Sequence, residues 1–547
     1  MFIRIKERDN GKKSIQIVST KRDGKKIFQK IFRYVGTACN EKEETELKKL
    51  AETIIIDHEN QTNPVLPCFS AKDIYGKANI SNEEDRVKIK NLREEKRIIE
   101  GIEDIFGRLY SEMGFDRLIK NTNKDDEWNS ILKQSVMTRI AYPVSKRRSI
   151  KILEEDFGIQ IPLEKMYRMM NHVFDHEDDI KNHIAQKTLG LFQGQVDVLF
   201  FDVTTLYFES FKEDELRKFG FSKDCKFKET QVVLALITTT KGLPLTYEVF
   251  SGNKYEGHTL EIMVDALRQK HQVREIHLVA DRAMFNEDNL TKMETEGASY
   301  TVAAKLKTLS KKIKKEILEN ACYKKVLVEN ETHWIMEYEL NNRRLIVSYN
   351  ADRAKKDASD RKRLVERLQK KVKDHEVNIK DLIPNYGTKK YLSINKTTVT
   401  INQDKIEQDA QWDGLHGVIT NIKNKKAEEI LQYYRGLWQI EATFRVSKND
   451  LKMRPMYHWT MKRIKAHVAI CFIALALIKY TLYKNLKQQI NMSFEQIRSE
   501  LLHVQSSIVN DVETKNKYII PAFMTENQKI IYKAFGLKRS EVPRRSN

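Results

Sequence analysis

The amino-acid sequence predicts an α/β protein made of several domains. The chain has 547 residues, which is more than a single hydrophobic core usually accommodates. Hydrophobic residues make up 40% of it, so there are enough apolar side chains to form folded cores. In the central part, segments with the two-residue period of strands alternate with segments that have helical spacing. Together these observations predict an α/β core with further units before and after it.

The balance of charges points to nucleic acid as the partner. There are 97 Lys and Arg residues against 77 Asp and Glu residues, a net charge of +20. A surplus of cations on a folded chain favours a polyanionic ligand. The longest apolar stretch, residues 466–478, is shorter than the roughly 20 residues that span a bilayer. We therefore expect a buried core helix there and no membrane partner.

The cysteines indicate a reducing location. Five are scattered along the chain without a C-x-x-C pair, at Cys39, Cys68, Cys225, Cys322 and Cys471. This spacing argues against a disulfide framework and against a cysteine-based zinc site. The cytoplasm is therefore the expected location.

The first 36 residues predict a small, basic antiparallel sheet. The strand-like runs FIRIKE, SIQIVST and KIFQKIF are separated by Asp9-Asn10-Gly11 and by KRDG at 21–24, both of which are typical of hairpin turns. A charged helix is expected at about 41–56. We assign residues 1–60 to this first domain.

Residues 61–190 are interpreted as a mainly helical DNA-binding region. Helical sequence is expected from about 84 to 120, and two short helices within 149–174 flank a break at Phe157-Gly158. Ahead of them stand the basic residues Lys146, Arg147 and Arg148. This is the pattern of a helix-turn-helix whose cations contact DNA, but two short helices joined by a glycine turn are also common in all-helical regions. Both interpretations stay open.

Three strands open the central core, and a helix, a strand, a helix and a strand follow them. This order is that of the ribonuclease-H-like topology, in which the first and fourth strands bring their ends together. We assign residues 191–305 to the first part of the core. The expected strands are 196–210, 231–240, 243–250, 275–281 and 299–305, and the expected helices are 258–271 and 286–297.

Two aspartates are expected to meet in this core. Asp202 interrupts the otherwise apolar strand LFFDVTTLY, and Asp281 ends the apolar run HLVAD. An unpaired charge at such positions is costly, so a cation should neutralise the pair. Mg²⁺ prefers oxygen ligands and is often held by one or two carboxylates, with Mn²⁺ as a substitute. The pair therefore predicts a metal site for phosphodiester chemistry.

A third carboxylate is expected from a long helix predicted at about 425–448. Glu441 has Tyr434 seven residues before it, and Arg445 and Lys448 four and seven residues after it, so all four share one helical face. That face would join a metal-binding carboxylate to cations that hold phosphates. The alternative is an exposed Glu–Arg pair on a solvated helix. The position of this helix after the two-aspartate sheet favours the catalytic interpretation.

Two cations directly after this helix are also expected to contact DNA. They are Lys452 and Arg454, although Arg454-Pro455 is also typical of a helix end. The remaining residues, 481–547, are assigned to a helical C-terminal region.

With these motifs in place, the chain resembles the DDE transposases of bacterial insertion sequences, in the branch named for a Y-R-E-K signature. The resemblance rests on FDVTTLYFES around Asp202, LPLTYEVFSGN, VADRAMFNEDNL around Asp281 and YYRGLWQIEATFRVSKNDLKMRP around Glu441. It extends from about residue 190 to residue 480. It implies that these three carboxylates hold Mg²⁺ in a ribonuclease-H-like catalytic domain.

The resemblance also implies how the catalytic domain is divided. A β-rich insertion at 306–411 would split it, and the second part, 412–480, would carry the glutamate helix. Family members use an aromatic residue of the insertion to hold a flipped base near the element end. Trp412 and Trp334 lie in or beside this segment, although an isolated Trp is more often a core residue.

In the family signature, the Tyr and the Lys correspond to Tyr434 and Lys448. The position of the signature Arg holds Leu437 in this chain. Its role would fall to Arg435, the nearest cation, or to Arg445 on the other side of the glutamate.

The resemblance implies a DNA transposase of an insertion sequence. Such an enzyme cleaves phosphodiester bonds at the element ends with Mg²⁺ and joins the 3′-OH ends to target DNA. Its expected partners are the terminal inverted repeats, the target DNA and a second copy of the chain, as a homodimer on DNA at the bacterial nucleoid. Two alternatives stay open: a non-catalytic or domesticated protein that binds terminal repeats, and a metal-dependent nuclease without strand transfer.

Overall fold

The computed structural model forms two compact units, Met1–Lys90 and Asn91–Asn547. Each unit has a sheet and a hydrophobic core of its own. The structure describes residues 1–547 apart from 8–11, 24–25, 63–88, 193–197, 221–227, 255–258, 270–275, 282–286, 320–321, 329–330, 374–388, 395–398, 489 and 546–547.

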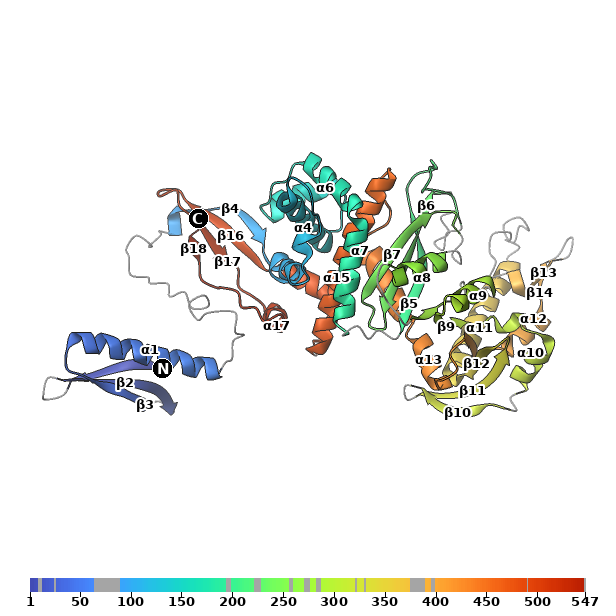
Figure 1. The fold of residues 1–547 in the computed structure, drawn as a ribbon, viewed down its shortest axis with the longest axis horizontal. Coiled ribbons are helices and arrows are strands. Elements are labelled where there is room, and N and C mark those ends of the chain that lie inside the picture. The colour runs from blue at the N-terminus through green and yellow to red at the C-terminus, as the bar shows by residue number, and fades with distance from the viewer. Residues whose placement is uncertain are drawn as a thin grey trace. The chain divides into compact units, whose positions relative to one another are not determined.

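The first unit is a three-stranded antiparallel sheet with one helix against it (Figure 1). Its elements are β1 (Phe2–Glu7), β2 (Lys13–Asp23), β3 (Lys26–Ala38) and α1 (Glu41–Thr62). Ile15 and Ile17 of β2 and Ala51 of α1 form its buried core. The predicted sheet and helix are confirmed, although β2 continues to Asp23, through most of the predicted second turn. The predicted turn Asp9-Asn10-Gly11 lies outside the described residues.

A helical layer opens the second unit, and a single strand precedes it. Its elements are β4 (Leu92–Ile99), α3 (Arg108–Glu112), α4 (Asp125–Ala141), α5 (Lys146–Asp156), α6 (Leu163–Asp175) and α7 (Glu177–Gly190), with short 3-10 or π turns at Ile89–Asn91, Glu103–Gly107 and Phe115–Arg117. The helix predicted from about 84 to 120 is wrong over Leu92–Ile99. Those residues form a strand because they pair with the far C-terminal strand β16, and such pairing overrides local helix preference.

The C-terminal region mixes helices with strands. Its elements are α15 (Met461–Lys487), α16 (Phe494–Leu502), β16 (Gln505–Asp511), β17 (Lys517–Pro521), α17 (Glu526–Ala534) and β18 (Arg544–Arg545). The strands form a four-stranded antiparallel sheet in the order β18-β17-β16-β4. The prediction of a helical region at 481–547 is therefore wrong for these strands, again because their partner lies far away in the sequence.

A nine-stranded mixed sheet forms the centre of the second unit, in the order β10-β11-β12-β15-β9-β8-β5-β6-β7. The predicted succession of three strands, a helix, a strand, a helix and a strand is observed. These elements are β5 (Leu199–Tyr207), β6 (Gln231–Thr239), β7 (Pro244–Ser251), α8 (Thr259–Gln269), β8 (His277–Ala280), α9 (Glu287–Thr295) and β9 (Ser299–Ala303). Strand β8 runs parallel to both β5 and β9, whereas β6 is antiparallel to both β5 and β7.

The segment predicted as an insertion contributes strands to this same sheet. Its elements are a 3-10 turn at Leu306–Thr308, α10 (Lys311–Leu318), β10 (Lys324–Val328), β11 (Glu331–Leu340), β12 (Arg343–Tyr349), α11 (Ala351–Lys373), a 3-10 turn at Lys389–Tyr391, β13 (Leu392–Ile394), β14 (Val399–Ile401) and α12 (Gln403–Ala410). Strand β15 (Leu415–Thr420) pairs with both β12 and β9, so it connects the two parts of the sheet.

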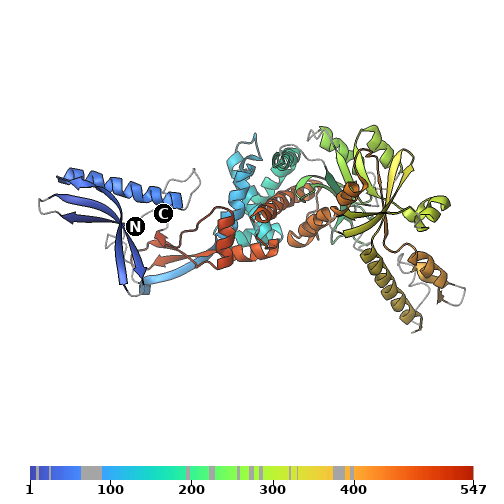
Figure 2. The same cartoon turned by 90° about the horizontal axis from the view of Figure 1, so that it is seen from below.

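Both faces of the central sheet are buried. Successive residues of a strand point to opposite faces. Phe200 therefore belongs to the hydrophobic core that also contains α4, α6 and α15, while Phe201 belongs to the core that also contains α8 and α9. Both views show α4, α6, α7 and α15 grouped on one side of β5, β6 and β7, and of these helices α7 and α15 contact β7 (Figures 1 and 2). This double burial explains the almost continuous apolar run of β5.

Helix α15 is the central helix of this layer. It is long and apolar enough to cross a membrane, but 78% of its most apolar 18-residue stretch is buried inside the protein. The predicted core helix at 466–478 is therefore confirmed. Of the cysteines, Cys39 and Cys322 are free and exposed and Cys471 is free and buried within α15, whereas Cys68 and Cys225 lie outside the described residues.

Candidate functional site

The register of two parallel strands brings Asp202 and Asp281 side by side. Phe201 of β5 is paired with Ala280 of β8, so the next residue on each strand is one of the two aspartates. Neighbouring strands lie about 4.8 Å apart. Asp202 is half-buried and accepts a hydrogen bond from the Val203 amide at 2.7 Å, whereas Asp281 is exposed where β8 ends. The predicted neighbourhood of these two carboxylates is therefore present.

The predicted glutamate helix is broken into three parts. They are α13 (Ala427–Arg435), α14 (Trp438–Arg445) and a π-helical turn at Val446–Asp450. The break lies at Gly436-Leu437, where short i to i−3 hydrogen bonds replace the α-helical ladder. A Cβ atom on Gly436 would lie only 2.5 Å from Cζ of Phe200 on β5. Only glycine fits this close approach, and it sets the path of α14 across the sheet.

Helix α14 has one buried and one exposed side. Ile440, Thr443 and Phe444 are buried, and the Thr443 hydroxyl donates its one hydrogen to the Gln439 carbonyl at 2.8 Å, with the Gly242 carbonyl as a second acceptor within reach at 3.3 Å. Glu441, Arg445 and Trp438 occupy the exposed side. The glutamate therefore faces away from the core, as its predicted role requires.

Tyr434 connects the glutamate helix to the aspartates. It is partly buried and packs against the ring of His416, with ring centroids 4.8 Å apart, and its hydroxyl lies close enough to the Asp281 carboxylate to interact with it. Burial first, and then the negative charges of Asp281 and Glu441, raise the pKa of Tyr434 above its ordinary value. Both carboxylates are therefore close enough to act on one phenol, although Tyr434 and Glu441 lie on different helices.

The donor set fits a hard divalent cation. Asp202 and Asp281 supply carboxylate oxygens from adjacent strands, and Mg²⁺ is often held in proteins by one or two carboxylates. Within the part of the chain that the structure describes, no three His, Cys, Asp or Glu side chains are gathered into a closed metal site. Glu441 acts on the same Tyr434 hydroxyl as Asp281, but in the described residues it does not complete a three-carboxylate cluster.

The predicted cations of the signature have different surroundings. Arg445 is exposed on the same side of α14 as Glu441, and Lys448 is half-buried on the following π turn. Arg435 pairs with Glu331 at 2.9 Å and contacts Nε2 of His333 at 3.2 Å. Arg435 therefore ties α13 to the β10–β11 hairpin, whereas Arg445 stands beside the glutamate.

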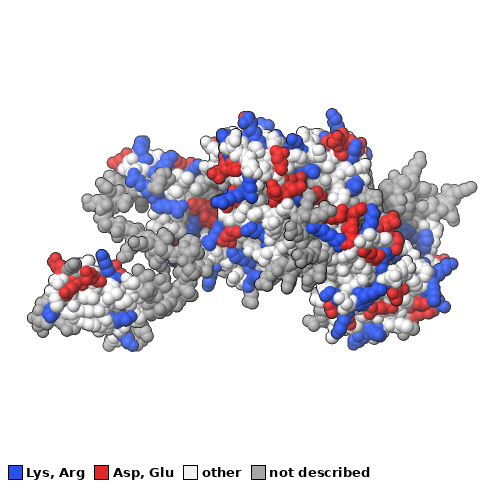
Figure 3. All heavy atoms as spheres, in the orientation of Figure 1, with Lys and Arg blue, Asp and Glu red and all other residues white. Residues whose placement is uncertain are grey.

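Two of the predicted cations, Lys452 and Arg454, lie just after the π turn that follows α14. Lys452 is exposed, and the guanidinium of Arg454 lies 5.8 Å from the ring centroid of Tyr207, near the end of β5. On the face drawn in Figure 3, Lys and Arg side chains are interspersed with Asp and Glu side chains. The positive charge surplus is thus spread over that face rather than concentrated in one patch.

The three basic residues ahead of the possible helix-turn-helix do not share one environment. Arg147 and Arg148 are exposed on α5. Lys146 is 3% exposed and donates a hydrogen bond to the Ser135 hydroxyl at 2.6 Å. Burial, together with the charge of Arg139, lowers the pKa of Lys146 to about 7. Lys146 is therefore unable to reach a DNA phosphate, contrary to the expectation from sequence, because its side chain is enclosed in the helical layer.

A cavity of about 520 Å³ adjoins Asp281 and Tyr434. It extends to Trp412, with Arg353 and Lys390 also in its wall. Trp334, by contrast, is 42% exposed on β11 and does not line this cavity. The family resemblance named both Trp412 and Trp334 as candidates for holding a flipped base, and nothing in the local sequence pattern links either of them to Asp281.

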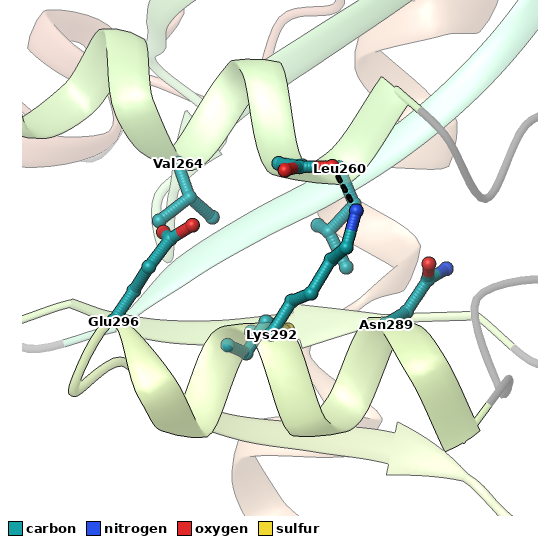
Figure 4. A pocket seen from close by; sticks show the side chains of 7 residues that line it. Leu260, Val264, Asn289, Lys292 and Glu296 are labelled. Carbon is teal, nitrogen blue, oxygen red and sulfur yellow. Dashed lines mark hydrogen bonds and ion pairs between the residues drawn. The ribbon is translucent and has the colours of Figure 1, made fainter.

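A second, much smaller cavity lies between α8 and α9 (Figure 4). Its volume of about 10 Å³ is no more than a single water molecule needs. Lys292 of α9 reaches across it to Glu261 of α8 at 2.6 Å, the contact that the dashed line marks. This cavity is a packing gap on the far side of the sheet from α14, and it is not part of the candidate site.

Comparison with known proteins gives one extended match and several remote ones. The family model described as "Transposase DDE domain" matches residues 194–477, just over half of the chain. The "Probable transposase for insertion sequence element IS5377" of Geobacillus stearothermophilus is 30% identical over 111 residues, which cover 20% of this chain and 28% of that protein.

Two solved structures are similar at low identity. One is the cryo-EM structure of the piggyBac transposase synaptic complex with hairpin DNA, at 11% identity and a TM-score of 0.36, covering 74% of this chain and 77% of that chain. The other is the Mos1 transposase paired-end complex with left transposon end, at 9% identity and a TM-score of 0.15, covering 33% of this chain and 60% of that chain.

Proposed function

Because the chain belongs to the family of proteins with a transposase DDE domain, we propose that it is the DNA transposase of an insertion sequence, in the Y-R-E-K branch. It would cleave phosphodiester bonds at the ends of its element and join the 3′-OH ends to target DNA. The observation that carries this proposal is the alignment of Phe201 with Ala280, which makes Asp202 and Asp281 neighbours beneath the glutamate helix.

The proposed catalytic residues are Asp202, Asp281 and Glu441. Asp202 stands on the first strand of the core and Asp281 directly follows the fourth, in what would be a ribonuclease-H-like arrangement, and Glu441 is carried by α14. These three carboxylates would hold Mg²⁺, and the closed set is expected to form when DNA is bound, since catalytic contacts are often long before the substrate arrives. When bound, the metal supplies Lewis-acid stabilisation of the charge that develops on the phosphate.

Cations beside the carboxylates would position the DNA backbone. Arg445 shares the exposed side of α14 with Glu441, so it would take the role of the signature arginine that Leu437 leaves empty. Lys448, on the next turn, would hold a neighbouring phosphate, with Lys452 and Arg454 further along the strand. Arg435, which is engaged with Glu331, would act by fixing α13 instead.

The chain's own hydrogen bonds would orient the acidic site. The Tyr434 hydroxyl would donate to one oxygen of Asp281 and so leave the second oxygen for the metal. This hydroxyl is protonated at physiological pH, and burial together with the charges of Asp281 and Glu441 raises its pKa further. The adjoining cavity, with Trp412 in its wall, would accept the base that is flipped out next to the cut.

Transposition requires two element ends to be held together, so a homodimer on DNA is the expected active form. The terminal inverted repeats and the target DNA would be its nucleic acid partners. Arg147 and Arg148 on α5 would contact the repeat if α5 and α6 read it as a helix-turn-helix.

A strand-transfer assay tests the proposed function. The full chain would be incubated with Mg²⁺, a supercoiled target plasmid and labelled DNA that carries the inverted repeats flanking the coding region. Labelled ends joined to the plasmid are the expected result. Nicked DNA without joining would indicate a nuclease, and a mobility shift without any cleavage would indicate a binding protein.

Matched carboxylate variants assign the residues. Asp281→Asn and Glu441→Gln should abolish cleavage while leaving DNA binding intact. Glu526→Gln removes a negative charge from the exposed start of α17 and should cleave like the unmodified protein. Cleavage at the unmodified rate by either site variant would refute the assignment.

A further inference from the structure

The loop between the glutamate helix and α15 exposes two aromatic rings. Tyr457 is 59% exposed and Trp459 is 60% exposed. Large rings are usually buried, and an exposed pair on one short loop often marks a binding surface. Neither ring belongs to the carboxylate site or to the cavity beside it.

This loop is firmly attached to the core. Met453 and Met456 are buried, the Met453 amide donates to the Ser447 carbonyl at 3.1 Å, and the Met456 amide donates to the Tyr207 carbonyl at 3.1 Å. The loop is thus fastened both to the π turn of the glutamate helix and to the end of β5. The two exposed rings are therefore presented from a fixed backbone.

Trp459 is supported from within the protein. The guanidinium of Arg217 lies 5.2 Å from its ring centroid, and Arg217 is itself only 5% exposed. An ion pair of 2.7 Å with Asp214 holds this guanidinium in place. A cation against a ring fixes the ring by a cation–π interaction. With Arg217 on one side and 60% of the residue exposed, the indole can accept a further planar group.

Cations flank the two rings along the chain. Lys452 is exposed on the loop itself, and Lys462 and Arg463 begin α15 with cation–π contacts to Phe174 and Tyr167 of α6, at 5.5 Å and 4.5 Å. Exposed rings among lysines and arginines are the combination that binds single-stranded nucleic acid, because the rings stack on bases and the cations bind phosphates. A hydrophobic protein partner would not require these cations.

The loop lies a short way from the acidic site. Tyr207, which anchors it, follows Asp202 by five residues on β5. At about 3.3 Å per residue this corresponds to roughly 17 Å, or the length of about five stacked nucleotides at 3.4 Å each. A DNA strand held at Asp202 can therefore extend to the loop.

We propose that Trp459 and Tyr457 form a stacking platform for unpaired nucleotides of the DNA strand that runs past the carboxylate site, with Lys452, Lys462 and Arg463 binding its phosphates. This inference deepens the proposed transposase function, since it names how the strand next to the cut is held. It assigns a binding role to a loop whose local sequence predicted only phosphate contacts.

A binding measurement tests the platform. The full chain is titrated into a fluorescein-labelled twenty-nucleotide oligothymidylate in EDTA, and binding is measured by fluorescence anisotropy at several NaCl concentrations. Trp459→Ala should weaken binding roughly ten-fold or more, since one stacked base contributes about 1–3 kcal/mol. Trp459→Phe should retain most of the affinity. Because the tryptophan neutralises no phosphate, the slope of log affinity against log salt should stay unchanged in both variants.

Two further variants complete the test. Lys462→Ala should lower the salt slope by about 0.7, the value for one phosphate contact on a single strand. Phe523→Ala is the matched control, since Phe523 is 80% exposed and also has a lysine against its ring, Lys529 at 5.0 Å, but lies in the C-terminal region. It should bind like the unmodified protein.

Equal binding by Trp459→Ala and the unmodified chain would overturn the platform, as would an equal loss in Phe523→Ala. Failure of the platform can be distinguished from failure of the proposed transposase function. If the unmodified chain joins ends to a target and Trp459→Ala still binds normally, the platform is wrong and the transposase proposal stands. If the unmodified chain neither cuts nor joins while Trp459→Ala loses binding, the platform stands and the transposase proposal falls.

Discussion

At the scale of single residues, Tyr434 has the most informative position in the candidate site. The charges of Asp281 and Glu441 both act on its hydroxyl and, after burial, raise its pKa. In the proposed site, the protonated hydroxyl would donate to Asp281 and hold that carboxylate in place. Tyr434 would then be a positioning residue of the acidic site.

Replacing Tyr434 by phenylalanine should slow cleavage roughly ten-fold to a hundred-fold. The substitution keeps the ring against His416 but removes the hydrogen bond that we propose to Asp281, and a hydrogen bond to a charged group contributes about 1.5–3 kcal/mol. Single-turnover cleavage over a range of Mg²⁺ concentrations would measure the loss. Tyr433→Phe is the control, since Tyr433 packs on His277 instead, and an equal loss there would contradict the role of Tyr434.

Lys146 should make the stability of the protein depend on pH above neutrality. Its pKa of about 7 lies far below the ordinary value of 10.5, so between these values the unfolded chain binds more protons than the folded chain. The free energy of unfolding should therefore rise with pH from about 7 towards 10, by at most about 1.4 kcal/mol per pH unit. Below pH 7 this contribution is constant and unfavourable.

Urea unfolding at pH 7, 8 and 9 would measure this rise. Lys146→Met should abolish most of it and should be the more stable protein at pH 7. Arg147→Met changes the neighbouring, exposed cation and should keep the rise of the unmodified protein. A Lys146→Met variant with an unchanged pH profile would show that this ammonium is not the group responsible.

The residue scale also shows what sequence can and cannot predict. The neighbourhood of Asp202 and Asp281 could be predicted, because a charge inside or at the end of an apolar strand is a local signal. The burial of Lys146 could not, since its pocket is built by Ser135 and Arg139 from a different helix. The local sequence around a cation before a predicted helix does not indicate whether its side chain faces solvent or the protein interior.

At the scale of elements, the break between α13 and α14 determines where Glu441 lies. The helical pattern of 425–448 predicts one continuous helix, and the structure has a turn at Gly436. The reason is tertiary: the ring of Phe200 occupies the space beside this residue, so the chain passes over β5 with no side chain at that point. Spacing alone placed Tyr434 and Glu441 on one helical face, whereas the fold brings them together across a bend.

Gly436→Ala should therefore displace α14 from β5 and so disturb the candidate site. The added Cβ would be 2.5 Å from Phe200, and overpacking of this kind costs about 1–3 kcal/mol of unfolding free energy. Cleavage should fall as α14 shifts. Gly190→Ala, at the end of α7, meets nothing within 4 Å and should leave both quantities unchanged or raise stability by up to about 1 kcal/mol.

Thermal unfolding and end cleavage of both variants would provide the measurements. If Gly436→Ala is as stable and as active as Gly190→Ala, the close packing of α14 on β5 does not control the site.

At the scale of the whole second unit, the C-terminal strand β16 is paired with β4, the first strand of this unit. Two C-terminal arginines add contacts at the end of β4. Arg539 is almost fully buried on its side chain and bonds to Glu100, which precedes the helical layer, as well as to the carbonyl of Gln505 at 2.7 Å. Arg544 contacts the same glutamate at 3.4 Å but is 58% exposed. The two arginines thus differ in burial while sharing a partner.

Arg539→Ala should lower the free energy of unfolding by about 3 kcal/mol, because it leaves Glu100 without its buried partner. Arg544→Ala should cost less than about 1 kcal/mol, as exposed ion pairs do. Chemical denaturation of the two variants under identical conditions tests this difference. Equal losses would mean that burial does not set the strength of these contacts.

Whole-molecule features were the least predictable from sequence. The core order from β5 to β9 follows from local periodicity and was predicted. The pairing of β4 with β16 and the extension of the central sheet by β10, β11 and β12 depend on partners far away in the chain, so no local pattern indicates them. The cavity between Asp281 and Trp412 escaped prediction for the same reason.

The pairing of β4 with β16 has a consequence for the timing of synthesis. Ser506, which bonds to Glu100, is made 406 residues later. At about 5–20 residues per second, a ribosome needs roughly 20–80 s to cover that distance. During this interval β4 has no partner strand, and Glu100 lacks Arg539. A nascent chain therefore contains the central strands, with Asp202 and Asp281, before β16 has been made, so the sheet that contains β4 forms only after the strands of the central sheet have been synthesised.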